Sequence, residues 1–265
     1  MNESALRKPT ESGIVSKTHM PFELDGGVAA RARIGMMVLS SDHTLEYEWR
    51  RIFAGLDGVA LYANRIYNST MVNPTTLAEM EARMTEVARL ILPGTPLDVV
   101  AYGCTSGTVV IGEDKVFARI REARPKVACT TPITGAVAGL TALGCKRIAL
   151  LTPYVEEVNQ VLRRHVESRG IGVPVMGSFN HENDDEVARI SMKSLQDAML
   201  DLGSSPDVDG VFVSCTSLRV VEIAEETERR LGKPVTSSNH AMAWHALRLA
   251  EIRDPLPGLG RLFRI

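Results

Sequence analysis

Leu97-Asp98-Val99-Val100-Ala101-Tyr102-Gly103-Cys104-Thr105-Ser106 is an apolar run that ends in Cys-Thr-Ser, and Val208-Asp209-Gly210-Val211-Phe212-Val213-Ser214-Cys215-Thr216-Ser217 repeats the design 111 positions later. Each run has the length and composition of a buried strand, and a segment with helical periodicity follows each tripeptide. The free N–H groups and positive dipole end of a helix start favour a thiolate, so we expect the pKa of both thiols to be lowered into a working range. The repeat therefore predicts two equivalent halves, each with a reactive sulfur where a strand meets a helix.

Strand-like runs alternate with amphipathic segments along the chain from Arg33. The expected strands are 34–40, 59–66, 97–102, 127–129, 148–151, 173–176 and 208–213. The expected helices are 76–92, 109–123, 133–143, 155–168, 185–202, 220–231 and 241–250, and Gly144, Gly170 and Gly203 lie at expected helix ends. Such alternation predicts parallel sheets covered by helices.

The expected fold is α/β, with two pseudo-symmetric, doubly wound (Rossmann-like) domains, parallel sheets and an interdomain active-site cleft. Ligands of open α/β sheets bind at the carboxyl ends of strands, where both cysteines lie, so both sulfurs are expected to face one ligand. Residues 1–32 are polar and show no period, which predicts a flexible N-terminal segment.

Composition excludes several other classes of protein. The 265 residues carry 30 Lys and Arg against 32 Asp and Glu, without the basic blocks that nucleic-acid binders use. The apolar runs are too short to span a membrane and the N-terminus has no apolar signal core, which predicts a cytoplasmic protein without a membrane partner. The four cysteines show neither Cys-x-x-Cys pairs nor zinc-ligand spacing, so we expect no disulfide scaffold and no metal site.

Several motifs resemble a known family. They are Gly103-Cys104-Thr105-Ser106-Gly107-Thr108, Thr130-Thr131-Pro132, Leu150-Leu151-Thr152-Pro153-Tyr154, Ser214-Cys215-Thr216-Ser217 and Ser238-Asn239-His240-Ala241-Met242-Ala243-Trp244-His245. In this order they resemble the aspartate/glutamate racemase superfamily, in the branch of maleate cis-trans isomerase and arylmalonate decarboxylase. The nearest resemblance is to isomerase-like proteins of ectoine-utilisation clusters.

The resemblance implies a cofactor-independent enzyme that acts on a small carboxylate, forms a homo-oligomer and holds one cysteine from each domain in the cleft. The family chain returns to its first domain near the end, which gives domains of 33–129 plus 236–265 and of 130–235. Cys104 is then the nucleophile or base and Cys215 the acid/base partner, either for racemisation or for thiol addition to a double bond followed by rotation.

Two other functions stay open at this stage. A decarboxylase of this branch needs only the second cysteine and has Gly at the first position, so Cys104 argues against that chemistry. A non-catalytic protein that binds small carboxylates is the other alternative, and it predicts binding that survives loss of both thiols. Cys129 and Cys145 lack the repeated motif and are interpreted as core residues.

Further candidate residues belong to the same cleft. Thr105, Ser106, Thr216 and Ser217 either cap helices or present N–H groups to a carboxylate. By resemblance, Tyr154 contacts substrate and Asn183 holds it, with Asn180 and Asp184 as alternatives for that alignment.

The first strand ends in Ser41-Asp42, where maleate isomerases usually have asparagine at the position of Asp42. An ionised Asp42 repels a carboxylate, so the hypothesis is a substrate bearing nitrogen, while a helix cap near residues 44–50 explains Asp42 equally well.

Histidines invite a hydrolase interpretation that the sequence does not support. His43, His240 and His245 lack an accompanying Gly-x-Ser-x-Gly elbow, so a Ser/His/Asp mechanism is disfavoured. His240 and His245 lie beside Trp244 in a segment of helical pattern, where packed or capping histidines are the commoner case. The thiol pair therefore remains the principal catalytic candidate.

Overall fold

Two parallel four-stranded sheets form the framework of the protein, in a computed structural model that describes residues 17–69, 74–181 and 183–265. The first sheet has the order β2-β1-β3-β4, from β1 (Ala32–Leu39), β2 (Val59–Ile66), β3 (Val99–Gly103) and β4 (Ala128–Thr130). The second has the order β6-β5-β7-β8, from β5 (Arg147–Thr152), β6 (Gly172–Ser178), β7 (Gly210–Val213) and β8 (Val235–Ser237). The two orders are the same when each half is counted from its own first strand, which confirms the pseudo-symmetric α/β fold.

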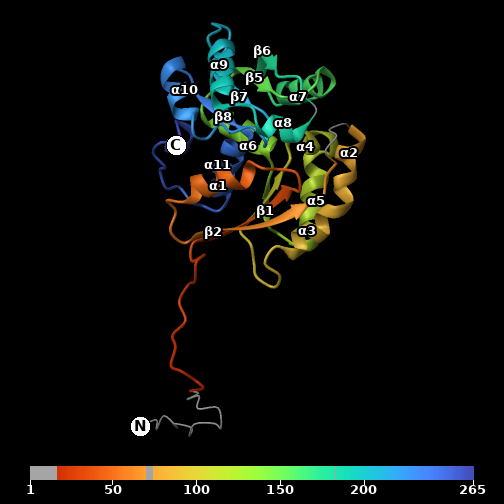
Figure 1. Ribbon diagram of the computed structural model, residues 1–265. Helices are drawn as coiled ribbons and strands as arrows, with labels where there is room; N and C mark the ends of the chain where they lie inside the picture. The colour runs from red at the N-terminus through yellow and green to blue at the C-terminus, as the bar shows by residue number, and fades with distance from the viewer. Residues whose placement is uncertain (1–16, 70–73, 182) are drawn as a thin grey trace.

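Helices connect the strands and cover the sheets (Figure 1). Those of the first half are α1 (Leu45–Phe53), α2 (Pro74–Ala78), the 3-10 turn η1 (Glu79–Arg83), α3 (Met84–Leu90), α4 (Thr105–Ile111) and α5 (Glu113–Ala123). The others are α6 (Pro132–Ala142), α7 (Glu156–Ser168), α8 (Asp184–Ala188), α9 (Met192–Gly203), α10 (Ala224–Leu231), α11 (Ser238–Leu249) and a final 3-10 turn η2 (Leu262–Arg264).

Both faces of the first sheet are buried. Alternate side chains of β1 point to opposite faces of the sheet, and they belong to two different cores. Ile34, Met36 and Val38 belong to the larger core, which includes Trp49 of α1. Met37 belongs to a second core with residues of α3 and α5. Two buried faces explain why β1 reads as a continuous apolar run rather than an alternating one.

Helices α6 and α11 cross closely and bring the two halves together. A Cβ atom on Gly135 of α6 would lie 2.7 Å from Met242 Cα and 2.8 Å from Ala241 O of α11. Only glycine permits this backbone approach, because ordinary Cβ contacts are longer. Helix α11 follows β8 of the second sheet and also contacts β3 and β4 of the first. The assignment of residues 236–265 to a first domain and 130–235 to a second stays a prediction.

The predicted strands lie within two residues of the observed ones, but several local expectations are wrong. The helices expected over 76–92, 109–123 and 185–202 are each divided, the first into α2, η1 and α3, the second into α4 and α5, and the third into α8 and α9. Strand β8 was not among the expected strands. Gly203 lies inside α9 rather than after it, packed against Leu231 and Val211 with no room for a Cβ. Most importantly, no helix starts at the second tripeptide, since Cys215 is followed by turns and α10 begins only at Ala224.

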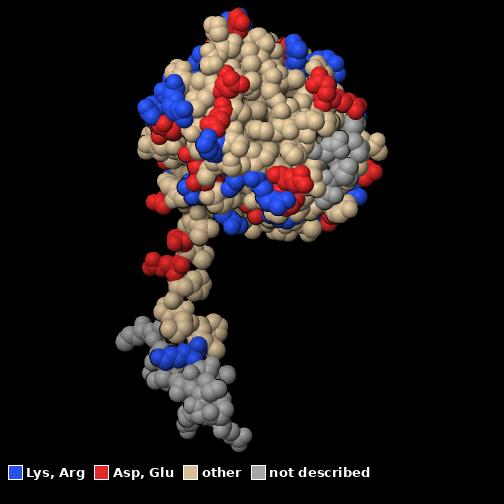
Figure 2. Space-filling model, turned by 45° about the horizontal axis from the view of Figure 1, so that its top comes forward, with Lys and Arg blue, Asp and Glu red and all other residues tan. Residues whose placement is uncertain are grey.

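The N-terminal residues 17–31 contain no helix or strand, and most of this segment extends away from the body of the molecule (Figure 1). Its last residues pack on the body, since Ala29 is buried and Arg31 N donates to Gly58 O at 2.8 Å. The face in Figure 2 carries acidic and basic side chains in small mixed groups rather than in one continuous basic area. Within the described ranges, no helix is both long and apolar enough to cross a membrane.

Candidate active site

Cys104 and Cys215 line one pocket between the two sheets, although they come from different halves of the chain. Tyr154 and Asp184 also line this pocket, which we call the thiol pocket. The remaining described lining residues are Leu39, Asn68, Ser69, Thr76, Leu77, Met80, Thr105, Ser106, Thr216 and Ser217. Its cavity volume of about 20 Å³ is room for roughly one water molecule.

The Cys104 sulfur caps the helix that follows it. Gly107 N donates to Cys104 Sγ at 3.2 Å, and the Ser106 hydroxyl lies 3.9 Å from the same sulfur. A Cβ on Gly107 would lie 2.8 Å from this sulfur and 2.8 Å from Tyr102 Oη. Glycine at position 107 therefore allows the sulfur to approach the helix N-terminus. The expected junction of strand, thiol and helix is confirmed for Cys104.

Cys215 is held differently, in a turn. Ser217 N donates to Cys215 Sγ at 3.4 Å, and Cys215 N donates to Ser238 Oγ at 3.1 Å. The Ser238 hydroxyl also lies 2.9 Å from Thr105 Oγ1, next to the other catalytic candidate. Ser238, the first residue of α11, thus links the backbone of one cysteine to the neighbour of the other.

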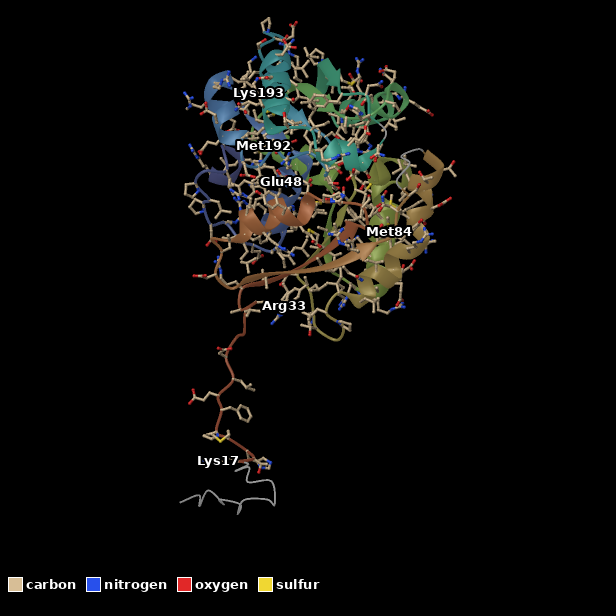
Figure 3. The ribbon with its side chains drawn as sticks, in the orientation of Figure 1. Lys17, Arg33, Glu48, Met84, Met192 and Lys193 are labelled. Atoms are coloured by element: carbon tan, nitrogen blue, oxygen red, sulfur yellow. The ribbon has the colours of Figure 1, made fainter. Side chains whose placement is uncertain are left out.

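A buried carboxyl supports the turn that carries Cys215. Glu48 Oε1 accepts hydrogen bonds from Val220 N at 2.6 Å and Val221 N at 2.7 Å, and Glu48 Oε2 accepts one from Asn239 Nδ2 at 2.7 Å. The same amide of Asn239 donates to Thr216 O at 2.7 Å. Figure 3 shows Glu48 on α1, at the side where this helix meets α11. Burial raises the pKa of Glu48 to about 7, against these hydrogen bonds.

Both thiols of the pocket are neutral at physiological pH, contrary to the expectation of lowered pKa values. Burial raises the pKa of Cys104 to about 11 and that of Cys215 to about 12, and the negative charge of Asp184 adds to both increases. The N–H groups of Gly107 and Ser217 lower the two pKa values, but by less than burial raises them. Desolvation of the thiolate was not visible in the sequence, because it depends on residues brought together by the fold.

The structure brings most of the predicted site residues to the thiol pocket. Tyr154 is only 7% exposed and faces both sulfurs closely enough that their charges would raise its pKa, though burial raises it most. The four Thr and Ser residues of the two tripeptides line the pocket, but none caps a helix through its side chain.

Ser41, Asp42 and Asn183 lie outside the described lining. Asp42 Oδ1 accepts hydrogen bonds from Thr44 N and Leu45 N, each at 2.7 Å, at the start of α1. Asn183 is exposed and caps α8 through bonds from Asp185 N and Glu186 N. Asn180 is exposed as well. The structure places the carboxyl of Asp184, rather than either of these amides, on the pocket wall.

Four residues of this site were missed or undervalued in the sequence: Asn68, Asp184, Glu48 and Ser238. Asn68 lines the pocket itself and holds Ser41 beside it, since Asn68 Nδ2 donates to Ser41 Oγ at 2.8 Å. Ser238 and Asn239 belong to the family-like motif at residues 238–245, which was the feature of the sequence that could have indicated their role. A single acidic residue within the amphipathic pattern of α1 gave no such signal for Glu48.

The histidines and the other two cysteines have structural surroundings. His240 is fully buried, with Nε2 2.7 Å from Leu259 O, and burial lowers its pKa to about 4. His245 Nδ1 lies 2.8 Å from Thr130 Oγ1. Cys129 and Cys145 are buried outside the thiol pocket. In the part of the chain that the structure describes, no group of three or more His, Cys, Asp or Glu side chains is arranged to hold a metal ion.

Comparisons with known proteins place the chain in a family. The family model described as arylmalonate decarboxylase matches residues 66–263. The arylmalonate decarboxylase of Bordetella bronchiseptica is 37% identical over 137 residues, which are 51% of this chain and 57% of that protein. The maleate isomerase of Nocardia farcinica is 28% identical over 242 residues, 88% of this chain and 95% of that protein.

Solved structures agree with the sequence matches. A maleate cis-trans isomerase from Nocardia farcinica with a covalently bound succinylcysteine intermediate has a TM-score of 0.80 and 26% identity, and the match covers 88% of this chain and 98% of that one. A liganded double mutant of arylmalonate decarboxylase has a TM-score of 0.79 and 29% identity, over 88% and 98% of the two chains.

The two-sheet fold and the sequence matches place the protein in the class of arylmalonate decarboxylases and maleate isomerases, as the sequence motifs indicated. The chain belongs to the arylmalonate decarboxylase family.

Proposed function

We propose that this protein is a cofactor-independent enzyme that uses Cys104 and Cys215 to isomerise or racemise a small carboxylate. The observation that carries the proposal is that both thiols line one pocket and follow strands of different sheets. An enzyme that moves a proton at carbon without a cofactor needs an acid and a base on opposite sides of its substrate. A pair of thiols supplies both groups.

Two reaction routes fit a pair of thiols. In racemisation, one thiolate removes the proton from the α-carbon and the other thiol delivers a proton to the opposite face, so the charges of the two sulfurs exchange. In cis-trans isomerisation, the Cys104 thiolate adds to the double bond and the Cys215 thiol gives a proton to the adjacent carbon. The new single bond rotates, Cys215 takes the proton back and the Cys104 thiolate leaves. The covalent succinylcysteine of the Nocardia farcinica isomerase supports the second route for that relative.

The backbone donors at each sulfur are the groups that would stabilise the thiolate. Gly107 N and Ser217 N each donate to a sulfur, and a hydrogen bond to a charged acceptor is stronger than one to a neutral acceptor. Because burial raises the pKa of both thiols, these N–H groups supply the stabilisation that the thiolate of either route requires.

Decarboxylation by Cys215 is the second candidate function, and the family model and the 37% identity to an arylmalonate decarboxylase favour it. It requires no acid or base at position 104. Reversible binding without turnover is the remaining alternative, in which neither thiol is needed.

Proton NMR in D2O tests the three candidates together, with wild type, Cys104→Ala and Cys215→Ala. The substrates are maleate, phenylmalonate, aspartate, glutamate and N-acetyl-diaminobutyrate, the last because of the resemblance to isomerase-like proteins of ectoine-utilisation clusters. Deuterium at the α-carbon or conversion of maleate to fumarate, lost in both variants, supports the proposal. Decarboxylation that persists without Cys104 contradicts it, and so does ligand binding without turnover that survives both substitutions.

A cytoplasmic location and a homo-oligomeric assembly remain parts of this proposal. Light scattering on the purified full chain tests the assembly, because a mass of 28.9 kDa is that of a single chain.

A further inference from the structure

Asp184 places a carboxyl directly on the wall of the thiol pocket. It is partly buried, and the Ser41 hydroxyl donates to Asp184 Oδ2 at 3.2 Å. The negative charge of Asp184 acts on both thiols and on Tyr154, since it raises the pKa of all three. A ligand between the two sulfurs therefore lies in the field of this carboxylate.

Asp42 supplies a second carboxyl close behind the pocket. Its Oδ1 is occupied as a helix cap, but its Oδ2 is buried and has no hydrogen-bond partner. Burial raises the pKa of Asp42, and the hydroxyl of the pocket residue Thr216 lowers it from nearby, although no hydrogen bond of ordinary geometry joins the two side chains. Burial raises the pKa of Asp184, and the negative charge of Asp42 raises it further. A buried, unpaired carboxylate oxygen is costly, which favours a partner that donates a hydrogen bond.

No described residue that lines the thiol pocket is Lys, Arg or His. By sequence, residues 70–73 and 182 carry no positive charge either. The nearby cations have other partners. Arg65 donates to the carbonyl oxygens of Leu39, Ser40 and Asp42 and to Glu46, and the exposed His43 lies 3.6 Å from Asp185. A substrate with two carboxylates would thus meet two further carboxyl groups and no cation in the described lining.

We infer that Asp184, with Asp42 behind it, selects a substrate whose group on this side of the pocket is a nitrogen with N–H donors, either an ammonium or an amide, and rejects a dicarboxylate. This inference rests on the proposed function, since it names the substrate class of the same pocket. The carboxyl that lines the pocket is that of Asp184, whereas the sequence pointed to Asp42. Repulsion between one added carboxylate and Asp184 in a partly buried site corresponds to a factor of about ten or more in binding or rate.

Alkylation of the two pocket thiols measures this selectivity without knowledge of the substrate. Iodoacetamide and iodoacetate have nearly the same shape, but the first carries a neutral carboxamide and the second a carboxylate. A third reagent, 2-bromoethylamine, carries an ammonium group. Rates at Cys104 and Cys215 are followed by peptide mass spectrometry at pH 8.5 and divided by the rates of glutathione in the same buffer. Wild type is compared with Asp184→Asn and Asp42→Asn, and Asp185→Asn is the matched control because its side chain is 62% exposed.

In wild type we expect the corrected ratio of iodoacetamide to iodoacetate rates to exceed one by about tenfold. Asp184→Asn should reduce this ratio at least fivefold, whereas Asp185→Asn should leave it within twofold. Faster reaction of bromoethylamine than of iodoacetamide identifies an ammonium site, and the reverse identifies an amide site.

A wild-type ratio near one, equal ratios in the Asp184 and Asp185 variants, or failure of all three reagents to modify either thiol would overturn the inference. Circular dichroism of each variant separates these outcomes from misfolding, and Asp42→Asn provides the second substitution if Asp184→Asn does not fold. The test is independent of turnover. Selective alkylation with no isotope exchange contradicts the proposed function alone, and exchange without selectivity contradicts this inference alone.

Discussion

Glu48→Gln should change how the stability of the protein depends on pH, because this buried carboxyl ionises at an unusual pH. Its pKa is about 7 in the folded chain and 4.5 in a free side chain. Between these values the folded state holds a proton that the unfolded state has lost. The stabilising contribution is therefore complete below pH 4.5 and is lost as the pH rises through 7.

The difference in pKa sets the size of the effect. The difference between a pKa of about 7 and one of 4.5 corresponds to about 3 kcal/mol in total, and most of this falls between pH 5 and pH 8. Glutamine keeps the shape and one acceptor oxygen for the N–H groups of Val220 and Val221, but it cannot ionise. Rearrangement of Asn239 around the new amide changes the free energy of unfolding by the same amount at every pH. It therefore does not affect the slope of that free energy against pH.

Urea unfolding at pH 5, 6, 7 and 8 measures the free energy of unfolding for both proteins. From pH 5 to pH 8, wild type should lose about 2 to 3 kcal/mol relative to Glu48→Gln. His240 and the carboxyls of Asp42 and Asp184 titrate in both proteins, so their contributions largely cancel in the comparison. Glu86→Gln, at a side chain 61% exposed, is the control and should follow wild type. Parallel curves for wild type and Glu48→Gln would refute the description of Glu48 as a strained buried carboxyl.

Two glycine substitutions test the close approaches in and near the site. Gly107→Ala should push the Cys104 sulfur away from the helix N-terminus and lower turnover at least tenfold, because the new Cβ would lie 2.8 Å from that sulfur, and a kinetic assay on any substrate found by NMR checks this. Unchanged turnover would count against the close sulfur contact. Gly135→Ala should destabilise the protein by about 1 to 3 kcal/mol in urea unfolding, since the new Cβ would meet the backbone of α11; a loss below about 0.5 kcal/mol would contradict the tight crossing.

Local sequence pattern was enough to predict the framework of the fold. Strand β2 occupies residues 59–66 as expected, because an apolar run bounded by polar turns is a local property. The meeting of Cys104 and Cys215 also followed from sequence, since parallel strands place their carboxyl ends at one edge of each sheet. The helix predicted over 109–123 is instead divided at Gly112, which lies between α4 and α5 and has a φ of 96°. A glycine at this position was the signal in the sequence for the break.

The electrostatics of the site required the fold. The helix start at Cys104 suggested a lowered thiol pKa, but burial among residues from both halves reverses the direction. Glu48 and Val220 are 172 positions apart, and nothing local relates them. The choice between Asn183 and Asp184 depended on a one-residue shift in the start of α8, which turns one side chain into a helix cap and the other toward the pocket. Hydrophobic periodicity does not fix the first residue of a helix to within one position, so it could not decide between the two side chains.

The central claim is that two thiols from two halves of the chain act together on one substrate. The most direct test is the rate of isotope exchange or isomerisation in Cys104→Ala, Cys215→Ala and the double variant, with Cys129→Ala as a buried-thiol control. Residues that act as a unit are strongly non-additive, so each single variant and the double variant should fall to the same background, about a thousandfold or more below wild type, and the control should stay within a few fold. Substantial activity in Cys104→Ala, or a double variant much slower than either single variant, would contradict the account.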